Sequence, residues 1–245
     1  NGVIIINSGT FNIATGDDAI HADTSLDIND GTFTISKCYE GLESSVITID
    51  GGYIQIVSSD DGINAGEESF SFGRPGGGST STGSSYYLKI NGGIIVIDAY
   101  GDGIDINGYI EMTDGLLVIN GPISNNNGPI DYDKSFQISG GTVIASGSSG
   151  MAQAPGSGSQ YAILVKFSTP QQANTLVNIQ TASGETVLTF RPTKTFQSLA
   201  FSSPDLDAGS YVIYLGGSST GTVTNGVYEG GAYTPGTQYT TFTLS

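Results

Sequence analysis

The sequence has no tryptophan, a single cysteine and few basic residues. Because Cys38 has no second cysteine to pair with in the chain, the cysteine content does not indicate an oxidising or a reducing compartment. The chain contains 7 Lys and Arg residues against 23 Asp and Glu, which gives a net charge of −16. This charge disfavours binding to nucleic acid or to an anionic membrane, and it favours cations or neutral ligands.

The sequence also lacks long apolar stretches. No run approaches the roughly 20 residues that a membrane-spanning helix requires, so we expect no insertion into a membrane. The chain opens directly on the strand-like pattern "NGVIIINSGTF", without the features of a signal peptide. Gly, Ser, Thr, Asn and Tyr are abundant and Lys is scarce, which is typical of secreted β proteins. We therefore expect an extracellular monomer, secreted or associated with a cell surface.

An internal repeat with a period of about 21 or 22 residues occupies residues 1–150. Its copies read "INSGTFNI", "INDGTFTI", "IDGGYIQI", "INGGIIVI", "MTDGLLVI" and "ISGGTVIA". The glycines that align are Gly9, Gly31, Gly52, Gly93, Gly115 and Gly141. The polar residues that align two positions earlier are Asn7, Asn29, Asp50 and Asn91. Asn and Gly adopt turn conformations that other residues resist, so these positions predict a corner of the fold.

Apolar residues two positions apart flank each aligned glycine, and a third short apolar pair follows, which is the pattern of three strands per repeat. The position two after the glycine holds Phe11, Phe33, Ile54, Ile95, Leu117 and Val143. The third strand begins with Ile20, Leu42, Ile63, Ile104 and Ile130. These columns predict an all-β fold, a parallel β-helix in which equivalent side chains stack roughly 4.8 Å apart.

The repeat stops near residue 150, and "MAQAPGSGSQ" reads as a linker. Hairpin-like strands follow, so we expect residues 151–245 to form a small antiparallel β domain that caps the solenoid end, where strand edges would otherwise stay unpaired. At the other end, "NG" at Asn1–Gly2 aligns with Asn107–Gly108. We therefore expect at least one further coil upstream.

Acidic residues recur beside the third strand, in "DDAIH", "YEGLE", "DDGIN", "GDGID" and "NGPID". Stacked coils bring these carboxylates about 5 Å apart, and their mutual repulsion calls for neutralisation. Ca²⁺ accepts such flexible oxygen ligands. The predicted ligands are Asp17, Asp18, Glu40, Glu43, Asp60, Asp61, Asp102, Asp105 and Asp131. The alternative is that these acids cap turns and face solvent, since Asp–Gly is a common turn pair.

Coils of this length resemble those of the right-handed parallel β-helices of the pectate lyase-like superfamily over residues 1 to about 147, and this resemblance raises two enzymatic hypotheses. A polygalacturonase-like site would add "GHG" and "RIK" to the two "DD" pairs, and neither motif is present. A lyase would need a basic residue near calcium, but Arg74 lies in an insertion, and Lys37 and Lys89 stand in different columns. His21 is expected to be a bystander or a weak metal ligand. No catalytic residue is predicted.

The combination of "INGGxIxI…DDGI.A" coils with "QYAILVKFST…FSSPDL" resembles a family of secreted bacterial carbohydrate-binding proteins. The family includes a protein of a cellulosome-forming, thermophilic clostridium. The resemblance implies a calcium-containing β-helix that binds cellulose and pectic polymers such as polygalacturonate without evident catalysis. A calcium-dependent lyase or hydrolase and a structural or adhesive surface protein remain as alternatives.

Sugar rings stack on flat aromatic side chains, and without tryptophan this role falls to tyrosine and phenylalanine. Some of the tyrosines at coil corners, Tyr132 in particular, would instead stack in the core. The insertion "GEESFSFGRPGGGSTSTGSSYY" adds aromatic residues and an arginine. The predicted sugar-contacting residues are Tyr39, Tyr100, Phe70, Phe72, Arg74 and Tyr86.

Overall fold

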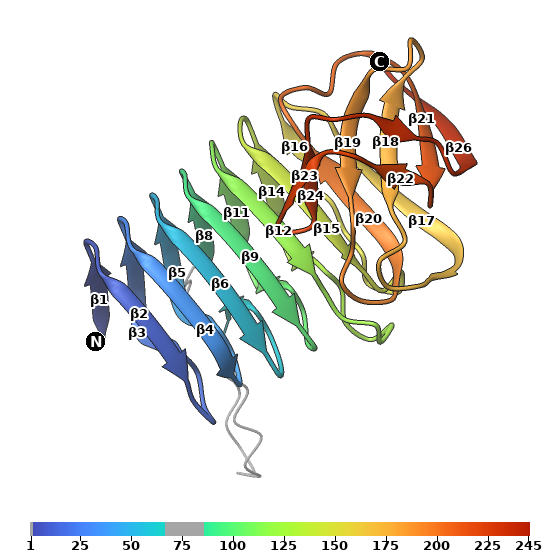
Figure 1. Ribbon diagram of the computed structural model, residues 1–245. Helices are drawn as coiled ribbons and strands as arrows, with labels where there is room; N and C mark the ends of the chain where they lie inside the picture. The colour runs from blue at the N-terminus through green and yellow to red at the C-terminus, as the bar shows by residue number, and fades with distance from the viewer. Residues whose placement is uncertain (1, 67–85) are drawn as a thin grey trace, which may run out of the picture.

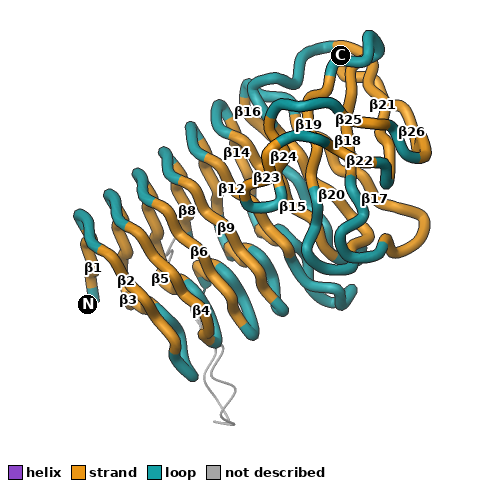
Figure 2. The backbone as a smooth tube through the Cα atoms, viewed as in Figure 1, coloured by secondary structure: helices purple, strands orange, loops and turns teal. Residues whose placement is uncertain are grey.

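The computed structural model describes residues 2–66 and 86–245, and all regular structure within these ranges is β-strand (Figures 1 and 2). The described residues form no helix, and so none that could cross a membrane. Six coils stack along one axis and end in a group of antiparallel strands (Figure 1). The predicted parallel β-helix with antiparallel strands at its C-terminal end is confirmed.

Two parallel sheets form the solenoid. Sheet B contains one strand from each coil: β2 (Thr10–Ala14), β4 (Thr32–Cys38), β6 (Tyr53–Ser58), β9 (Ile94–Ala99), β12 (Leu116–Asn120) and β15 (Thr142–Gly147). Sheet A contains β1 (Val3–Ile6), β3 (Ile20–Ile28), β5 (Leu42–Ile49), β7 (Ile63–Ala65), β8 (Tyr87–Ile90), β10 (Ile104–Ile106), β11 (Tyr109–Met112), β13 (Asp131–Tyr132), β14 (Ser135–Ile138) and β16 (Ser157–Gly158).

The strand division differs from the prediction in the first coils. There, the third strand of one coil and the first strand of the next form one continuous strand, as in β3 and β5. Between β10 and β11 the two strands are separated by Asn107–Gly108, a turn-forming pair. In β3 the equivalent link contains Asp23 and Thr24, and β-branched threonine favours extended backbone, so the strand continues.

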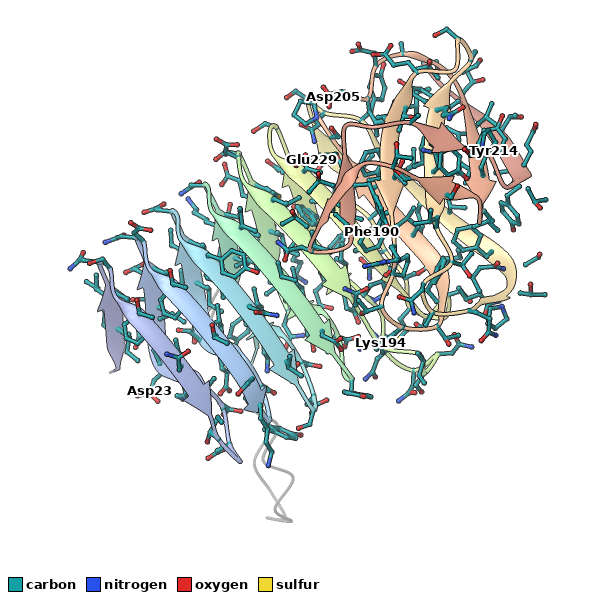
Figure 3. The ribbon with its side chains drawn as sticks, viewed as in Figure 1. Asp23, Phe190, Lys194, Asp205, Tyr214 and Glu229 are labelled. Carbon is teal, nitrogen blue, oxygen red and sulfur yellow. The ribbon has the colours of Figure 1, made fainter. Side chains whose placement is uncertain are left out.

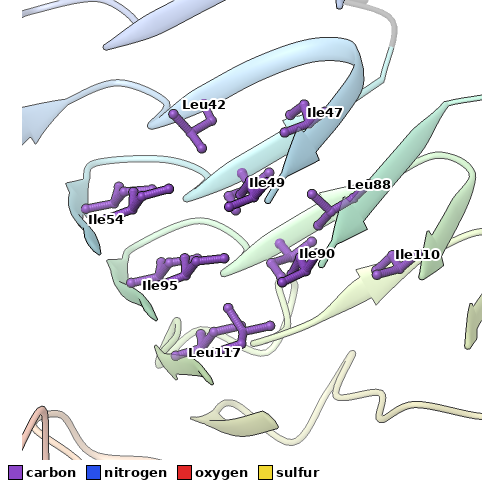
Figure 4. Packing of buried hydrophobic residues seen from close by; sticks show 14 of the residues in the cluster. Leu42, Ile47, Ile49, Ile54, Leu88, Ile90, Ile95, Ile110 and Leu117 are labelled. Atoms are coloured by element: carbon purple, nitrogen blue, oxygen red, sulfur yellow. The ribbon is translucent and has the colours of Figure 1, made fainter. Parts of the chain in front are cut away.

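The strand register reproduces the predicted columns. Phe11 pairs with Phe33, which pairs with Ile54, and Ile20 pairs with Leu42. The Phe11 and Phe33 rings stack with centroids 4.7 Å apart. The inward side chains form one continuous core (Figure 4). Each fully buried Ile or Leu contributes about 1.5–3 kcal/mol, so these columns are the main source of the solenoid's stability.

The predicted corner also forms. All six aligned glycines have positive φ, from 79° at Gly141 to 140° at Gly9, a conformation that side chains with a Cβ resist. Beside them the polar column is hydrogen-bonded from coil to coil: Asn29 Nδ2 donates to Asn7 Oδ1 at 2.8 Å, and Asn91 Nδ2 donates to Asp50 Oδ1 at 2.8 Å. The corner therefore satisfies its amide groups within the stack.

The C-terminal strands continue sheet B and add a second layer. β20 (Phe196–Ser202) pairs antiparallel with β15, and β17 (Ala162–Gln171) pairs with β20. Sheet C faces them with β18 (Val177–Thr181), β19 (Thr186–Phe190), β21 (Gly209–Leu215), β23 (Thr222–Thr224), β24 (Val227–Glu229) and β26 (Thr237–Leu244). A short pair, β22 (Ser218–Ser219) and β25 (Tyr233–Thr234), completes the group. β20 thus covers the edge that β15 would otherwise expose.

The C-terminal layer also covers part of the outer face of sheet B. Val118 and Ile144 point away from the solenoid interior, yet both are buried, in a second core cluster that includes Phe190 and Phe201. This packing explains why the "GLLVI" and "GTVIA" coils have apolar residues where the first three coils have Asn12, Thr34 and Gln55. The outer face of β2 and β4, which lies far from these strands in Figure 1, has threonine and asparagine instead.

Lys194 connects the two parts of the molecule (Figure 3). Its Nζ lies 2.7 Å from Asp98 Oδ1 of β9, donates to the Ala99 carbonyl at 2.5 Å, and lies 4.7 Å from the centre of the Tyr100 ring. Burial lowers the pKa of Lys194, and the Asp98 carboxylate opposes that shift. The contacts with Asp98, Ala99 and Tyr100 therefore maintain the charged form of the Lys194 ammonium group.

We expect Lys194→Met to lower the free energy of unfolding by about 2 kcal/mol, because it keeps the apolar stem but leaves the Asp98 carboxylate and the Ala99 carbonyl without their donor. Urea titration measures the change. Lys166→Met, at an exposed position of β17, is the control and should change stability by less than about 0.5 kcal/mol. Equal stability of the two variants would contradict this role for Lys194.

Candidate functional site

The predicted acidic residues form two neighbouring columns along the solenoid. In the strand column His21 pairs with Glu43, Glu43 with Asn64, Asn64 with Asp105, and Asp105 with Asp131. The corner column contains Asp18, Glu40, Asp61 and Asp102, joined by backbone hydrogen bonds between coils. Glu40, Glu43 and Asp102 are buried, whereas Asp17 is exposed. The acids therefore lie against the protein rather than on a fully solvated face.

Within these columns, two groups of side chains bring possible ligand atoms within 4.8 Å of one another. The aspartate cluster consists of Asp61, Asp102 and Asp105. The histidine cluster consists of Asp18, His21 and Glu43. Five predicted ligands thus belong to a cluster, and the other four lie beside them in the columns or on the exposed corner. Those four are Asp17, Glu40, Asp60 and Asp131.

In the aspartate cluster, the carboxylates bind the backbone of the following coil. Asp61 Oδ1 accepts the amide of Asp102 at 2.6 Å, and Asp102 Oδ1 accepts the amide of Gly128 at 2.5 Å. Burial, the largest cause, and neighbouring carboxylates raise the pKa of Asp61 to about 8, that of Asp102 to about 7 and that of Asp105 to about 6. Among the described residues no Lys or Arg pairs with these three acids.

Glu40 lies in the corner column between the two clusters. Its backbone amide donates to Asp18 Oδ1 at 3.1 Å, and its Oε2 accepts Asn64 Nδ2 at 3.0 Å. Burial and the charges of Glu43 and Asp18 raise the pKa of Glu40 to about 7, against the lowering effect of the Asn64 hydrogen bond. Ionising the Glu40 carboxyl group without a neutralising partner therefore costs free energy, as it does in the aspartate cluster.

In the histidine cluster, His21 lies against three acids rather than apart from them. Its Nδ1 is hydrogen-bonded to Glu43 Oε2 and lies 3.8 Å from Asp18 Oδ2, while its Nε2 lies 3.5 Å from Asp23 Oδ1. Burial lowers the pKa of His21, but the hydrogen bonds and charges of the surrounding acids outweigh it and raise the pKa above 6.5. The "DDAIH" segment carries this contact because its register places His21 opposite Glu43.

The glycine after each acid has a steric role. Gly41, Gly62 and Gly103 precede the buried anchors of the third strand, and none of them has a positive φ. A Cβ on Gly62 would lie 2.4 Å from Cγ2 of Ile97 and 2.5 Å from the Gly103 carbonyl oxygen. The "DG" pairs therefore mark a close approach between coils and not a turn that requires left-handed backbone.

Two of the predicted sugar-contacting tyrosines are exposed at the corner that follows sheet B. The side chain of Tyr39 is 47% exposed and that of Tyr100 is 64% exposed. A hydrogen bond to Asp60, the largest cause, raises the pKa of Tyr39 to about 12. Tyr86 is partly buried against the core. Phe70, Phe72 and Arg74 lie outside the described residues.

A second aromatic surface was not predicted. Tyr87 of β8 and Tyr109 of β11 are register partners on the outer face of sheet A, with ring centroids 6.1 Å apart. Lys89 Nζ lies 5.1 Å from the Tyr87 ring centre and 3.8 Å from Glu111 Oε2. The signal in the sequence is that "YLKI" and "YIEM" place a tyrosine at the same position of the aligned strands.

A cavity of about 720 Å³ lies in the C-terminal layer between the loops around Ser183 and Asp205. Its aromatic wall residue, Tyr211, is buried and its hydroxyl donates to the Asp207 carbonyl. No exposed ring lines this cavity among the described residues, so it lacks the flat surface that sugar stacking requires.

A comparison with protein-family models matches residues 1–85 to a family described as "Carbohydrate-binding domain-containing protein". No curated protein and no solved structure matches the chain significantly. The matched segment contains the first coils, the histidine cluster, Tyr39 and Asp61. Over these residues the match confirms the resemblance to carbohydrate-binding proteins.

Proposed function

We propose that the protein is an extracellular, non-catalytic binder of plant cell-wall polysaccharide, either cellulose or polygalacturonate, and that calcium held by the acidic columns stabilises it. The observation that carries the proposal is the pair of exposed tyrosines, Tyr39 and Tyr100, which lie on one corner of a rigid solenoid. The family match over residues 1–85 supports carbohydrate as the ligand class.

The corner offers a linear surface along the solenoid axis. The Asp60 amide donates to the Tyr39 carbonyl at 3.0 Å, and the Gly101 amide donates to the Asp60 carbonyl at 3.0 Å, so these residues stack coil upon coil. Tyr100 directly precedes Gly101, which places it two coils from Tyr39, roughly 10 Å along the axis at about 4.8 Å per coil. That spacing suits two pyranose rings of an extended chain, with Asp60 between them as a hydrogen-bond acceptor.

The donor chemistry of the aspartate cluster fits calcium. Asp61, Asp102 and Asp105 supply carboxylate oxygens only, they are largely removed from water, and no Lys or Arg of the described chain neutralises them. Ca²⁺ prefers oxygen ligands and tolerates irregular geometry. A bound calcium would supply the missing positive charge and join the third and fourth coils. An acidic polysaccharide would be attracted to the same edge only with such a cation present.

A second candidate function is a calcium-dependent lyase or hydrolase. The observation that favours it is the set of carboxyl groups with raised pKa in the aspartate cluster, because such groups also occur in active sites. Against it, Asp61 and Asp102 each use one oxygen to bind a backbone amide. Lys89, the cation nearest in sequence to the Asp102 coil, has Glu111 and Tyr87 as its contacts. Assaying the supernatant for released reducing or unsaturated sugars distinguishes the two functions.

We expect the double variant Tyr39→Ala/Tyr100→Ala to weaken polysaccharide binding about 30-fold, since each lost stacking contact costs about 1 kcal/mol. The measurement is depletion of protein from solution by insoluble cellulose and by polygalacturonate gels, in excess Ca²⁺. Circular dichroism checks that the variant is folded.

Tyr87→Ala/Tyr109→Ala is the matched control, because it removes a stacked tyrosine pair from the outer face of sheet A and should leave binding unchanged. If this control alone loses binding, the polysaccharide surface lies on sheet A. If wild-type protein is not depleted by either polymer, carbohydrate binding itself is wrong and a structural or adhesive role is favoured.

A further inference from the structure

We propose that the histidine cluster is a separate site for a transition-metal dication of the Zn²⁺ type, held by Asp18, His21 and Glu43. The proposal goes beyond polysaccharide binding and beyond the calcium proposed for the aspartate cluster. It follows from the donor atoms of the three side chains, from their orientation, and from a fourth residue that supports the histidine.

The donor set differs in kind from that of the aspartate cluster. One imidazole nitrogen and two carboxylate oxygens form a mixed nitrogen–oxygen set, which suits Zn²⁺ and related ions, whereas Ca²⁺ selects oxygen alone. Three protein ligands with a fourth position left to water or another ligand is the usual composition of an open zinc site. The two clusters, which lie in the same acidic columns, are therefore expected to prefer different metal ions.

Backbone pairing positions the three donors. His21 of β3 and Glu43 of β5 are register partners, so their side chains leave adjacent strands on the same side. Asp18 Oδ1 accepts the Glu40 amide, which orients Asp18 Oδ2 toward His21 Nδ1 at 3.8 Å. Ligand atoms about 2.1 Å from a tetrahedral Zn²⁺ lie about 3.4 Å apart, and these three lie within 4.8 Å of one another. The separation of 3.8 Å between His21 Nδ1 and Asp18 Oδ2 is close to that spacing.

The other ring nitrogen of His21 faces a carboxylate. Nε2 lies 3.5 Å from Asp23 Oδ1, and Asp23 Oδ2 in turn accepts the Gly2 amide at 3.1 Å. A histidine that ligates a metal nearly always donates its second N–H to such an acceptor, which fixes the tautomer and makes the ligating nitrogen more basic. Asp23 therefore holds the proton on Nε2 and leaves Nδ1 for the metal, on the side where Asp18 and Glu43 lie.

Among residues 2–66 and 86–245, the cluster is open on one side. A cavity of about 360 Å³ adjoins it, and the lining includes His21, Asp23, Glu43, Ser45 and Tyr86. The His21 side chain is 43% exposed, whereas those of Asp18 and Glu43 are 12% and 7% exposed. A metal ion can thus enter past the imidazole, and the cavity leaves room for water or a ligand oxygen in its fourth position.

The alternative is a protonated His21 that neutralises the acids without any metal. The test uses the full chain, stripped with chelator, returned to excess Ca²⁺ and titrated calorimetrically with Zn²⁺; Co²⁺ serves as a spectroscopic probe for tetrahedral coordination. We expect saturable binding of one Zn²⁺ that excess Ca²⁺ does not displace. His21→Gln should abolish this binding, and Asp23→Asn should weaken it about 10- to 100-fold.

Asp105→Asn is the matched control, because it removes a ligand from the aspartate cluster only and should leave Zn²⁺ affinity unchanged. Thermal unfolding of each variant checks the fold, and Asp23→Asn keeps the test decisive if His21→Gln does not fold. Absence of saturable Zn²⁺ binding in excess Ca²⁺ would overturn the proposal in favour of the protonated histidine. Equal Zn²⁺ affinity of wild type, His21→Gln and Asp23→Asn would overturn it too, since the ion would then lie elsewhere.

Discussion

In excess chelator, raising the pH from 5 to 8 should lower the free energy of unfolding of this protein by about 3 kcal/mol or more. The cause is the set of buried acids whose folded pKa exceeds the reference value of 3.8 for aspartate: about 6 for Asp105, about 7 for Asp102 and about 8 for Asp61. Each unit of pKa difference between the folded and unfolded states corresponds to about 1.4 kcal/mol.

The sign follows from proton binding. Between the unfolded and the folded pKa values, the folded state binds more protons than the unfolded state, so stability falls as the pH rises. The contribution is fully present below about pH 4 and is lost as the pH passes through 6 to 8. With excess Ca²⁺ the ion compensates the ionised carboxylates, and the difference in melting temperature between the calcium-loaded and the chelated protein should widen over the same interval.

The measurement is denaturant or thermal unfolding at several pH values, with Ca²⁺ and with chelator. Asp61→Asn keeps an oxygen for the Asp102 amide but removes the most strongly shifted carboxyl group, so it should flatten the pH dependence and reduce the calcium effect. Glu185→Gln, at an exposed position of the C-terminal layer, should alter neither. Stability that stays constant between pH 5 and 8 in chelator would contradict the proposed role of the aspartate cluster.

Gly62→Ala should cost about 3 kcal/mol or more, an unusually large effect for adding one methyl group. The new Cβ would lie 2.4 Å from Ile97 Cγ2 and 2.5 Å from the Gly103 carbonyl oxygen. Moving either group costs free energy, because Ile97 is fully buried and the Gly103 carbonyl accepts the Ile63 amide. Overpacking in a dense core typically costs 1–3 kcal/mol, and here a hydrogen bond between coils is strained as well.

Urea unfolding followed by circular dichroism measures the loss. The control is Gly16→Ala at the same corner of the first coil, where a Cβ meets nothing within 4 Å and φ is not positive. This variant should be neutral or slightly stabilising. The first coil already has Ala19 at the position equivalent to Gly62, beside an interior that is only partly buried. If Gly62→Ala is as stable as the wild type, the prediction is wrong, and the inner coils accommodate a Cβ as the first coil does at Ala19.

Local patterns in the sequence were sufficient for most of the solenoid. Apolar residues two apart, repeated with a constant period, predict which side chains stack, and the register of Phe11, Phe33 and Ile54 follows that pattern. The aligned glycines predict the corner, because glycine itself adopts positive φ readily, as it does at Gly52 and Gly93. The same pattern predicts that the acids line up, because their columns repeat with the strands.

The candidate sites needed more than alignment. The acids align over five coils, but the two clusters form only where side-chain length and neighbouring amides orient the oxygens, as Glu40 does for Asp18. His21 carries no signal by itself, and its role depends on Glu43, Asp18 and Asp23 all lying around one ring. Whether these side chains meet around the His21 ring depends on their rotamers in three dimensions, and the spacing of residues in the sequence does not determine those rotamers.

The sequence by itself thus determined the coil, its period, its core columns and the acidic edge, because each depends on residues close in the chain or on a repeat of constant length. Tertiary structure alone decided how the C-terminal layer sits. Lys194 meets Asp98 across 96 positions of the chain, and Val118 becomes a core residue only once that layer covers it. These contacts join segments with no shared periodicity, so no local pattern encodes them, and burial between packed surfaces determines them instead.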